Sequence, residues 1–358
     1  MAFKLRNGLY IEKAATDMMI AYDTEEAMKD GWLRPQFWRR RNTDQLSGIY
    51  RQQDIDDQLR LYDTEVAFSG TQDGVSEVSF EMDTDIPFKA RAFALEGVID
   101  YVENAAGDPV INYASRVTQD TQFKFFNSLE GYSVSNLRNP ALLTQSIPLS
   151  NAERLDNYTS SASNPIAQLI AAKWLIRQDT NKIMNRVAID ADVWEWGFKL
   201  HPYIIARAPV QVAPNILGAG ATMTKELLEK ILEIPEGSIV IYDKRYNPAR
   251  LGETPKNKRK SHLGSDIICA YVEDPNIAST GFGHEVAFTG LSELPSDYPF
   301  AILTYEDLKR GLYGSQRVRF VSLANWIPTR PQSAVRITNT VDLTDLKKYG
   351  YNGYSVLD

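Results

Sequence analysis

The sequence has one cysteine, three histidines and no long apolar run. Cys269 has no partner within the chain for a disulfide bond, which indicates a protein that folds in a reducing compartment. The apolar stretch PIAQLIAAKWLI is interrupted by Lys173 and falls short of the roughly 18 residues that a membrane helix needs. The N-terminal MAFKLRNGLYIEKAATDMM lacks the apolar core of a secretory signal. We therefore expect a chain made in the cytoplasm, without a membrane span.

Motifs of catalytic and cofactor chemistry are missing as well. The histidines are not spaced as zinc ligands usually are, and they are His201, His262 and His284. Cys269 lies in the apolar segment IICAYV, which favours a buried, inert thiol. GAGAT at 218–222 lacks the third glycine of a dinucleotide-binding loop, and the sequence has neither a GxSxG motif nor a P-loop lysine. The acidic runs DIDD at 54–57 and DTD at 83–85 lack the rest of a calcium loop, so we expect no enzyme, cofactor or metal site.

The charge balance is acidic. The formal net charge is -7, so the surface as a whole repels phosphate, and a dedicated nucleic-acid binder would need a concentrated basic patch. Two short basic runs are present, and they contain Arg39, Arg40 and Arg41 in the first and Lys256, Lys258, Arg259 and Lys260 in the second. Each run is open to three interpretations: solvated loop charge, a contact between subunits, or a site that reads DNA sequence.

Residues 46–95 have the alternation of two β-strands. The strand-like stretches are LSGIYRQ and SEVSFEMDTDIPFKARAF, and in the second Val78, Phe80 and Met82 alternate with polar neighbours. The polar, glycine-bearing stretch SGTQDGVS lies between them. A two-stranded ribbon is only marginally stable alone in water, so this long hairpin needs another surface to lie on. A neighbouring chain is one source of that surface.

Two long segments predict helices. From about 109 to 138, apolar residues recur at steps of three and four, and Pro109 suits a first helical turn. The residues of this stripe are Val110, Tyr113, Ala114, Val117, Thr121, Phe125 and Leu129. The second helix begins at SNPIAQLIAAKWLI, where Ser163 or Asn164 is the expected cap and Pro165 takes the first-turn position. Its expected apolar face contains Ile166, Leu169, Ile170 and Trp174.

The stretch AIDADVWEWGFKLHP concentrates acids, aromatics and one histidine. NRVAID predicts a short buried strand, after which Asp190 caps a helix from about 191 to 200 and Asp192 favours its first turn. The aromatic stripe of this helix consists of Trp194 and Phe198 together with Trp196 and Leu200. His201 falls at the helix C-terminus, where a donor suits the free carbonyls. These roles are structural.

The second half of the chain is mostly β by pattern. The expected strands lie in YIIARAP, GSIVIYDKRY, DIICAYVE, EVAFTGL, QRVRFVSLANWIP and SAVRITNTV. The helix TKELLEKILEI, capped by Thr224, separates the first two of them. A short helix is expected in EKAATDMMIAYDTEEAMKDG, and the tail KKYGYNGYSVLD is expected to be extended and ordered by a partner surface.

Four stretches, in this order along the chain, carry a resemblance to a known family. They are FFNSLEGYSVSNLRNPALLT, SNPIAQLIAAKWLIRQDTNKIMNRVAIDADVWEWGFKLHP, ATMTKELLEKILEIPEGSIVIYDKRYNPA and SQRVRFVSLANWIPTRPQSAVRITNTV. They resemble the end of the spine helix, the start of the axial domain, its next helix and strand, and the closing strands of the major capsid proteins of tailed double-stranded DNA phages. These proteins have the Hong Kong 97 fold, which encapsulin nanocompartments share. The likeness spans roughly residues 45–341, and SHLG at 261–264 stands where relatives often have an aromatic before the glycine.

The resemblance implies an α+β, Hong Kong 97-like capsid fold. Its parts are an N-terminal arm, an extended β-hairpin loop (E-loop), a peripheral domain with a long spine helix, and an axial domain. The implied boundaries are 1–45 for the arm, 46–92 for the hairpin, 93–141 for the peripheral domain with its spine helix at about 108–138 and later strands at about 310–341, 142–309 for the axial domain, and 342–358 for the tail.

The function implied by the resemblance is structural and not enzymatic. The subunit is expected to self-assemble through hexameric and pentameric capsomers into an icosahedral virion shell, in the cytoplasm of a bacterial host. The implied partners are other copies of the chain, a portal, scaffold or decoration proteins, and packaged double-stranded DNA bound without sequence specificity, with no membrane and no cofactor. The residues expected to contact neighbouring subunits are Phe68, Val78, Phe80, Met82, Arg39, Arg40, Arg41, Lys258 and Arg259.

Two alternatives stay open at this point. An encapsulin-like cargo shell would have the same fold and would be recognised by a cargo peptide inside particles that lack a DNA-packaging portal. An unrecognised hydrolase or metal enzyme would show a pocket in which His201, Asp192 and Glu195 converge.

Overall fold

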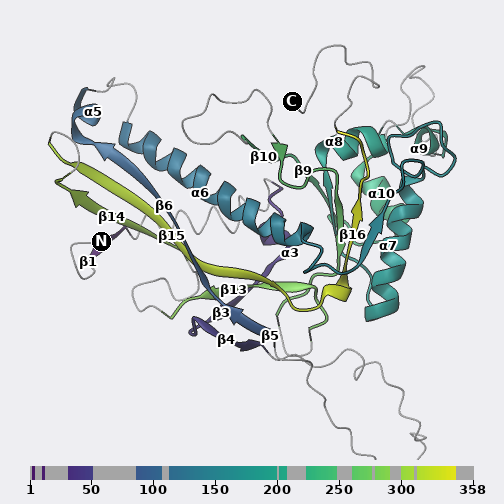
Figure 1. Cartoon of the computed structure of the whole chain (residues 1–358), viewed down its shortest axis with the longest axis horizontal. Coiled ribbons are helices and arrows are strands. Elements are labelled where there is room, and N and C mark those ends of the chain that lie inside the picture. The colour runs from purple at the N-terminus through teal and green to yellow at the C-terminus, as the bar shows by residue number, and fades with distance from the viewer. Residues whose placement is uncertain are drawn as a thin grey trace, which may run out of the picture.

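Figure 1 shows the computed structural model of the chain, in which a long helix lies between two β-sheets. The structure describes residues 2–4, 10–12, 31–50, 86–106, 113–199, 201–207, 223–247, 260–275, 279–290, 300–309 and 313–343. Within these ranges no helix has both the length and the apolar character needed to cross a membrane.

The larger sheet has seven strands. Their order is β1-β2-β14-β15-β13-β3, with β6 also paired to β15. The bounds are β1 Ala2–Lys4, β2 Tyr10–Glu12, β3 Arg39–Thr43, β6 Arg91–Asp100, β13 Gly283–Phe288, β14 Phe300–Asp307 and β15 Ser315–Pro328. Buried and half-buried residues alternate along most of β15, as the period of a strand requires. Because β15 pairs antiparallel with β6, β14 and β13, it is the strand that holds this sheet together.

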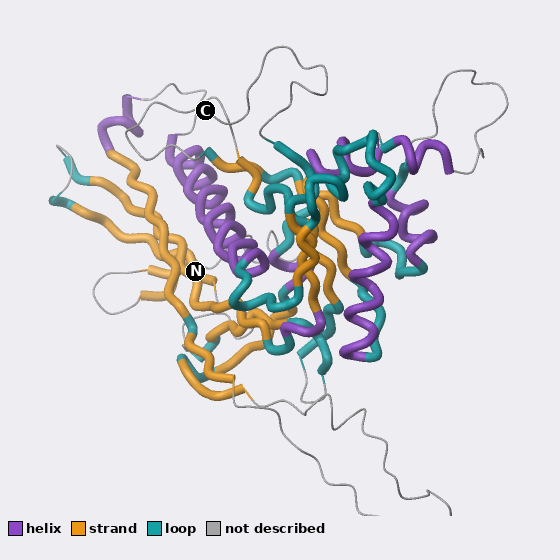
Figure 2. Tube along the Cα trace, turned by 45° about the vertical axis from the view of Figure 1, so that its right-hand side comes forward, coloured by secondary structure: helices purple, strands orange, loops and turns teal. Residues whose placement is uncertain are grey.

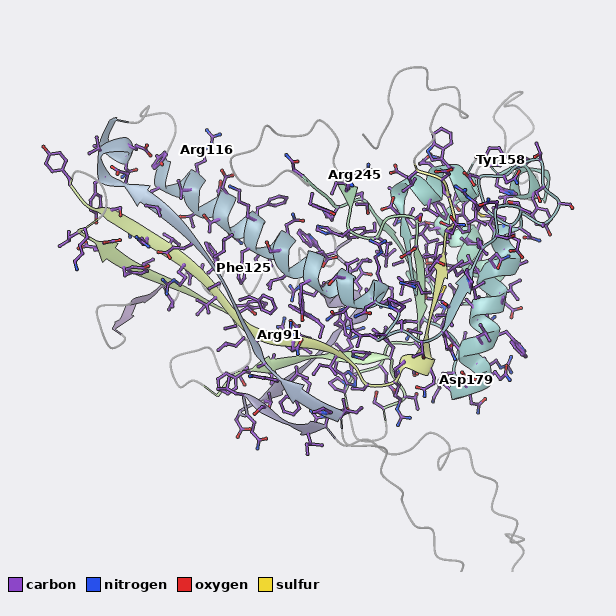
Figure 3. All side chains as sticks on the ribbon, in the orientation of Figure 1. Arg91, Arg116, Phe125, Tyr158, Asp179 and Arg245 are labelled. Atoms are coloured by element: carbon purple, nitrogen blue, oxygen red, sulfur yellow. The ribbon has the colours of Figure 1, made fainter. Side chains whose placement is uncertain are left out.

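The 26-residue helix α6 (Tyr113–Arg138) lies along the seven-stranded sheet (Figures 1 and 2). Figure 3 shows Phe125 directed from α6 toward the sheet, whereas Arg116 points away from it. The ring of Phe125 lies 6.0 Å from that of Phe320 in β15, and Leu129 is fully buried. The predicted apolar stripe is therefore the buried face of the helix over the described residues. Residues 107–112, which include Pro109 and Val110, lie outside them.

The smaller sheet has five strands in the order β7-β16-β12-β8-β9. The bounds are β7 Ser146–Pro148, β8 Arg186–Asp190, β9 Ile239–Tyr242, β12 Ile267–Ala270 and β16 Ala334–Thr338. Successive residues of β12 enter different cores: Ile267 and Cys269 pack with the helices on one face, and Ile268 and Ala270 with α6 on the other. The helices of the first face are α7 (Pro165–Thr180), the π-helix η2 (Trp194–Lys199) and α10 (Lys225–Leu232). A strand buried on both faces reads as a continuous apolar run, which is why IICA predicts it.

The predicted helix caps are present in the structure. Side-chain oxygens of Asn164, Asp190 and Thr224 accept hydrogen bonds from backbone N–H groups two or three residues later, at 3.1, 2.9 and 3.3 Å. Each bond satisfies a donor that has no partner inside its helix, so the three helices begin where the sequence predicts.

Around residue 200 two predictions are wrong, those for YIIARAP and for His201, and a third, the helix at about 191–200, is confirmed as helical but differs in type. YIIARAP, expected as a strand, lies largely in helix α9 (Pro202–Arg207), because Pro202 suits a first turn and His201 Nδ1 accepts the Tyr203 N–H at 3.2 Å. His201 therefore caps the helix that follows it and not the carbonyls of the helix before it. The helix expected from about 191 to 200 is one short turn, α8 (Ala191–Val193), followed by the wider π-helix η2.

The expected apolar face of α7 is also wrong in part. The buried stripe consists of Leu169, Ala172 and Ile176, whereas Ile170 and Trp174 are 49% and 60% exposed. The sequence does not separate the two sides of α7 because both are apolar.

The predicted ribbon begins and ends as a strand pair. β4 (Ser47–Tyr50) and β5 (Ile86–Lys89) form a two-stranded antiparallel sheet, which we call the hairpin base. Residues 51–85 lie outside the described residues. The remaining short elements are α3 (Arg34–Phe37), α5 (Tyr101–Ala106), β10 (Arg245–Tyr246), β11 (Lys260–Ser261) and the 3-10 turn η3 (Pro331–Ser333).

The two sheets do not follow the domain boundaries that the resemblance implies. β13 and β14 fall within 142–309 but belong to the seven-stranded sheet, and β16 falls within 310–341 but belongs to the five-stranded sheet. The chain thus passes between the two sheets more than once, which a division into consecutive segments does not capture.

Replacement of Trp194 by alanine tests the core of the five-stranded unit. Trp194 is buried and stacks on Phe198 with ring centroids 5.6 Å apart, so Trp194→Ala should lower the free energy of unfolding by about 3 to 5 kcal/mol through the cavity it leaves. Urea unfolding followed by circular dichroism measures the change. The matched control is Phe123→Ala on α6, because Phe123 is 58% exposed and its loss should cost less than ~1 kcal/mol. Equal losses in the two variants would contradict the core role of Trp194.

Candidate functional site

A short segment near the N-terminus is buried between α6 and the two sheets. We call residues 32–38 the arm anchor, because Trp32, Leu33, Phe37 and Trp38 all belong to the main hydrophobic core. The segment includes the single turn of α3. Its burial places the chain that precedes β3 against the body of the protein.

A buried carboxylate on α6 holds the arm anchor in place. The backbone N–H groups of Leu33 and Arg34 donate to the two carboxylate oxygens of Glu130 at 2.7 and 3.0 Å. Glu130 is fully buried, and its oxygens satisfy donors at the start of α3 that have no partner in that turn. The anchor is therefore fixed to the C-terminal half of α6 by hydrogen bonds as well as by packing.

A second buried carboxylate, Glu285 of β13, holds the side chains of the same segment. Arg34 Nη1 lies 3.2 Å from Glu285 Oε1, and Arg40 Nε lies 3.2 Å from Oε2. The guanidinium of Arg34 also lies 5.6 Å from the centre of the Phe300 ring. Since a buried charge without a partner would be strongly destabilising, these pairings specify how β3 lies beside β13.

The three consecutive arginines lie in strand β3, so the interpretation as solvated loop charge is wrong. Each of them contacts another part of the chain: Arg39 lies 3.6 Å from Asp274, Arg40 lies 3.2 Å from Glu285, and Arg41 lies 4.2 Å from the centre of the Tyr50 ring. All three side chains are half-buried. Their contact with a neighbouring subunit stays a prediction.

A cavity of about 420 Å³ opens between the hairpin base and the β3–β13 pair. Its lining combines polar and apolar side chains, among them Arg41, Gln45, Ile49, Tyr50 and Phe88. At the same place Leu46 and Ile49 are 53% and 55% exposed. The hairpin base thus presents apolar side chains to its surroundings beside a concave surface.

His284 is fully buried in β13, behind the Tyr50 ring. The two ring centroids are 5.8 Å apart, and within the described part of the chain neither ring nitrogen of His284 has a hydrogen-bond partner. Burial, aided by the charge of Arg41, lowers the pKa of His284 to about 4. The imidazole is therefore neutral near pH 7 and serves as packing.

The other residues expected to contact neighbouring subunits lie outside the described residues. They are Phe68, Val78, Phe80, Met82, Lys258 and Arg259. Of the second basic run the structure describes Lys260, at the start of β11. The contacts of these residues stay predictions, and so do the interpretations of GAGAT, DIDD and DTD, which also lie outside the described residues.

The three residues of the enzyme alternative do not converge. Each has its own partner: Asp192 pairs with Arg245 at 2.7 Å, Glu195 with Lys199 at 2.9 Å, and His201 Nε2 with Ser163 Oγ at 2.9 Å. The first two are ordinary surface ion pairs. Only the third resembles a catalytic pairing.

In the hydrogen bond between His201 and Ser163 the histidine is the donor, whereas a nucleophilic serine must donate its proton to the histidine. Because Nδ1 of His201 accepts the Tyr203 N–H, the ring proton is assigned to Nε2, which donates to Ser163 Oγ. The hydroxyl of Ser163 in turn donates to the carbonyl of Arg154 at 2.7 Å. Tyr158, marked in Figure 3, packs edge-on against the ring at 5.6 Å. The arrangement fixes a loop and leaves the imidazole unable to accept the serine proton.

The remaining reactive groups are buried or engaged. Cys269 is fully buried in β12, and burial raises the pKa of its thiol to about 12, so the thiol stays protonated. In the ranges that the structure describes, no three or more His, Cys, Asp and Glu side chains gather into a group that could hold a metal ion.

A second cavity, of about 350 Å³, lies beside the C-terminal half of α6. His262 stacks on Tyr246 there with ring centroids 4.5 Å apart, and its Nε2 lies 3.2 Å from Asn127 Oδ1. Arg138 turns its Nε to Asp266 at 2.9 Å. The polar groups around this cavity are thus paired within the chain.

Sequence reasoning missed the two carboxylates that hold the arm anchor. A partial signal for Glu130 exists: it follows Phe126 by four residues and Leu129 directly, so an acid lies beside the apolar stripe of the predicted helix. Glu285 gives a similar signal, as an acid inside the apolar strand HEVAF. A charge in such a position requires a buried partner, but the sequence does not say which one.

The described part of the chain has an α+β fold. Its buried carboxylates, Glu130 and Glu285, hold the arm anchor and β3 in place. The sequence matches no family model and no curated protein. Among solved structures, a phage-related protein from Bordetella bronchiseptica matches 92% of this chain and 97% of its own, with a TM-score of 0.65 and 16% identity. The two chains therefore share a fold.

More distant matches extend over a similar part of the chain. The holo-SrpI encapsulin of Synechococcus elongatus PCC 7942 has a TM-score of 0.47 and 10% identity, covering 86% of this chain and 86% of its own. The capsid structure of cyanophage P-SCSP1u has a TM-score of 0.46 and 10% identity, covering 87% of this chain and 86% of its own.

Glu130 should make stability depend on pH. Burial raises its pKa to about 7 from 4.5, against the hydrogen bonds from Leu33 and Arg34. Because the folded-state pKa lies above the unfolded one, the contribution is fully present below pH 4.5 and is lost as the pH rises to 7. Glu130→Gln does not ionise and should remove roughly 3 kcal/mol of pH dependence over that range.

Urea unfolding at pH 5 and pH ~7.5 measures this slope in both proteins. Glu130→Ala is the contrasting variant, because it removes both acceptors and should be less stable than Glu130→Gln at either pH. A slope that persists unchanged in Glu130→Gln would show that the carboxyl does not titrate in the folded protein.

His284 should make stability depend on pH in the opposite direction to Glu130. Its folded-state pKa of about 4 lies below the ordinary 6.5, so its contribution is present above pH 6.5 and is lost as the pH falls toward 4. His284→Phe keeps a ring and removes two unpaired nitrogens, and it should raise the free energy of unfolding by ~1 kcal/mol at neutral pH and by more at pH ~5. His262→Phe is the control at neutral pH, where it should give no gain because it breaks the contact with Asn127. Burial also lowers the pKa of His262 to about 4, so at pH ~5 each variant is compared with wild type and not with the other. Thermal unfolding distinguishes the two, and a destabilised His284→Phe at both pH values would rule out this account.

Proposed function

We propose that this chain is the structural subunit of an icosahedral capsid that encloses the double-stranded DNA of a tailed phage. It functions by self-assembly into hexameric and pentameric capsomers, in the host cytoplasm and then in the virion. It performs no catalysis. The partners are other copies of itself, a portal, and scaffold or decoration proteins.

The observation that carries the proposal is the hairpin base. β4 and β5 pair with each other in a two-stranded sheet, and a sheet of two strands is marginally stable alone. Leu46 and Ile49 at this base are more than half exposed, beside the cavity lined by Tyr50 and Phe88. A neighbouring subunit in a shell supplies the surface that such a ribbon needs.

Two further observations support the proposal. The chain shares its fold with a phage-related protein over 92% of its length, and four stretches of sequence resemble Hong Kong 97-like capsid proteins. The net charge of -7 suits a container whose wall does not retain the phosphates of incoming DNA. Such DNA is bound without sequence specificity.

We assign the parts of the fold on the basis of the two sheets. Residues 1–45 form the N-terminal arm, 46–92 the extended loop and 342–358 the tail. The peripheral domain comprises α6 as the spine helix with β6, β13, β14 and β15, with which the arm strands β1, β2 and β3 form one sheet. The axial domain comprises the five-stranded sheet with α7, η2 and α10. On this assignment β13 and β14 belong to the peripheral domain and β16 to the axial domain.

Subunit contacts in such a shell need not be individually strong. A repeated heterologous contact that closes on itself is multiplied over many copies. The residues assigned to these contacts are Phe68, Val78, Phe80, Met82, Arg39, Arg40, Arg41, Lys258 and Arg259. For Arg40 the role is shared, because it also pairs with Glu285.

Negative-stain electron microscopy of the purified full-length chain tests the proposal. The expected result is uniform hollow particles, or rings of about five or six subunits, because closed symmetric assemblies have fixed copy numbers. A monomer that persists at high concentration would contradict the function. Particles that retain a cargo peptide and have no portal would identify an encapsulin-like shell instead.

A further inference from the structure

Helix α7 is apolar on two opposite sides. Its inner side consists of Leu169, Ala172 and Ile176, which are fully buried against the five-stranded sheet. Its outer side carries a second stripe at helical spacing, formed by Ala167, Ile170, Ala171 and Trp174, all of them exposed. An apolar stripe on a helix is normally covered by another part of the protein, so the exposed outer stripe is the exception to explain.

The outer stripe exposes large side chains. Trp174 is 60% exposed and Ile170 is 49% exposed, and they lie one helical turn apart on the same face. We call this surface the α7 outer face. Figure 1 places α7 on the side of the five-stranded sheet away from α6.

The composition of the α7 outer face is that of an interface centre. Tryptophan and arginine are the residues most enriched among those that dominate binding energy, and the exposed Arg177 follows Trp174 by three residues. The small side chains of Ala167 and Ala171 let another surface approach the helix closely between the two large ones.

Charge points to a second copy of this chain as the occupant. Along α7 and just after it, the basic residues Lys173, Arg177 and Lys182 outnumber the one acid, Asp179, on a chain whose net charge is -7. Identical copies repel each other overall, and the attraction is greatest where a basic face of one copy meets the acidic surface of another.

The size of the face points the same way. Two large side chains that are half exposed, with their small neighbours, present on the order of 200–400 Å², whereas a stable isolated pair buries about 800 Å² on each partner. The α7 outer face is therefore too small to hold a dimer alone. It suits one contact among several that each copy makes in a closed ring.

We propose that the α7 outer face, centred on Trp174 and Ile170, packs against a second copy of this chain within a ring of subunits. The proposal rests on the proposed shell function and adds to it the surface through which neighbouring five-stranded units meet.

The first test is Trp174→Asp in the full-length chain, with Phe123→Asp on α6 as the matched control. Phe123 is also an exposed aromatic on a helix, at 58%. Sedimentation velocity across a concentration series measures the subunit concentration needed for assembly. Trp174→Asp should raise that concentration by ~10-fold or more, and Phe123→Asp should leave it within about two-fold of wild type. Equal effects of the two variants, or none from Trp174→Asp, would overturn the proposal.

The second test does not depend on a disruptive variant. Cys269 is fully buried, so Ala171→Cys adds the one reactive thiol among the described residues. Maleimide should label it rapidly in dissociated subunits and slowly in assembled ones, whereas Ser128→Cys, exposed on α6, should label at the same rate in both. Equal labelling of Ala171→Cys in both states would overturn the proposal.

Protection that appears only when nucleic acid or another protein is added would likewise overturn it, because the occupant would not be a second copy. If wild-type subunits form no rings or particles, the shell function itself fails, and this outcome is distinct from the failure of the α7 outer face alone.

Discussion

The structure depends on one buried carboxylate, that of Glu130, which accepts the backbone N–H groups of Leu33 and Arg34. These two hydrogen bonds fix the arm anchor on α6, and the anchor then fills the space between α6 and both sheets with Trp32, Phe37 and Trp38. Because β3 follows directly after the anchor, its parallel pairing with β13 also depends on this fixed point. β4 of the hairpin base comes next in the chain, so its position depends on the same fixed point.

Burial of this much charge is an unusual way to hold a segment. Arg34 and Glu285 are nearly inaccessible to water, and removing an ion from water costs several kcal/mol even after relaxation. The same cost raises the pKa of the buried Glu130 carboxyl to about 7. Apolar residues of the same shape would give similar or greater stability, so stability alone does not account for the arrangement. A charged network has few satisfactory geometries, whereas apolar contacts have many. The network therefore specifies one position for the arm anchor and for β3 beside β13.

The sequence predicts what is local and misses what joins distant segments. The caps at Asn164, Asp190 and Thr224 act within three residues, so the pattern reveals them. The contact between Glu130 and Leu33 spans 97 positions, and that between Arg34 and Glu285 spans 251, so no local pattern reveals either. The error at YIIAR has another cause: its β-branched residues favour a strand, but Pro202 and the cap from His201 outweigh that preference. The alternation of β15 is local and was predicted, but its three strand partners were not.

Helix α7 is apolar on two sides, and contacts within one copy of the chain explain only one of them. Periodicity separates an apolar side from a polar side, and in PIAQLIAAKWLI no such contrast exists. Inside one copy, the sheet covers Leu169 and Ile176 and leaves Trp174 to solvent, although all three are equally apolar by pattern. If selection acted on the isolated fold alone, a polar residue at position 174 would serve solubility better. An exposed tryptophan one helical turn from the exposed Arg177 is consistent with a protein whose folded unit is completed by assembly. In such an assembly, weak and partly electrostatic contacts can form and break before the structure closes.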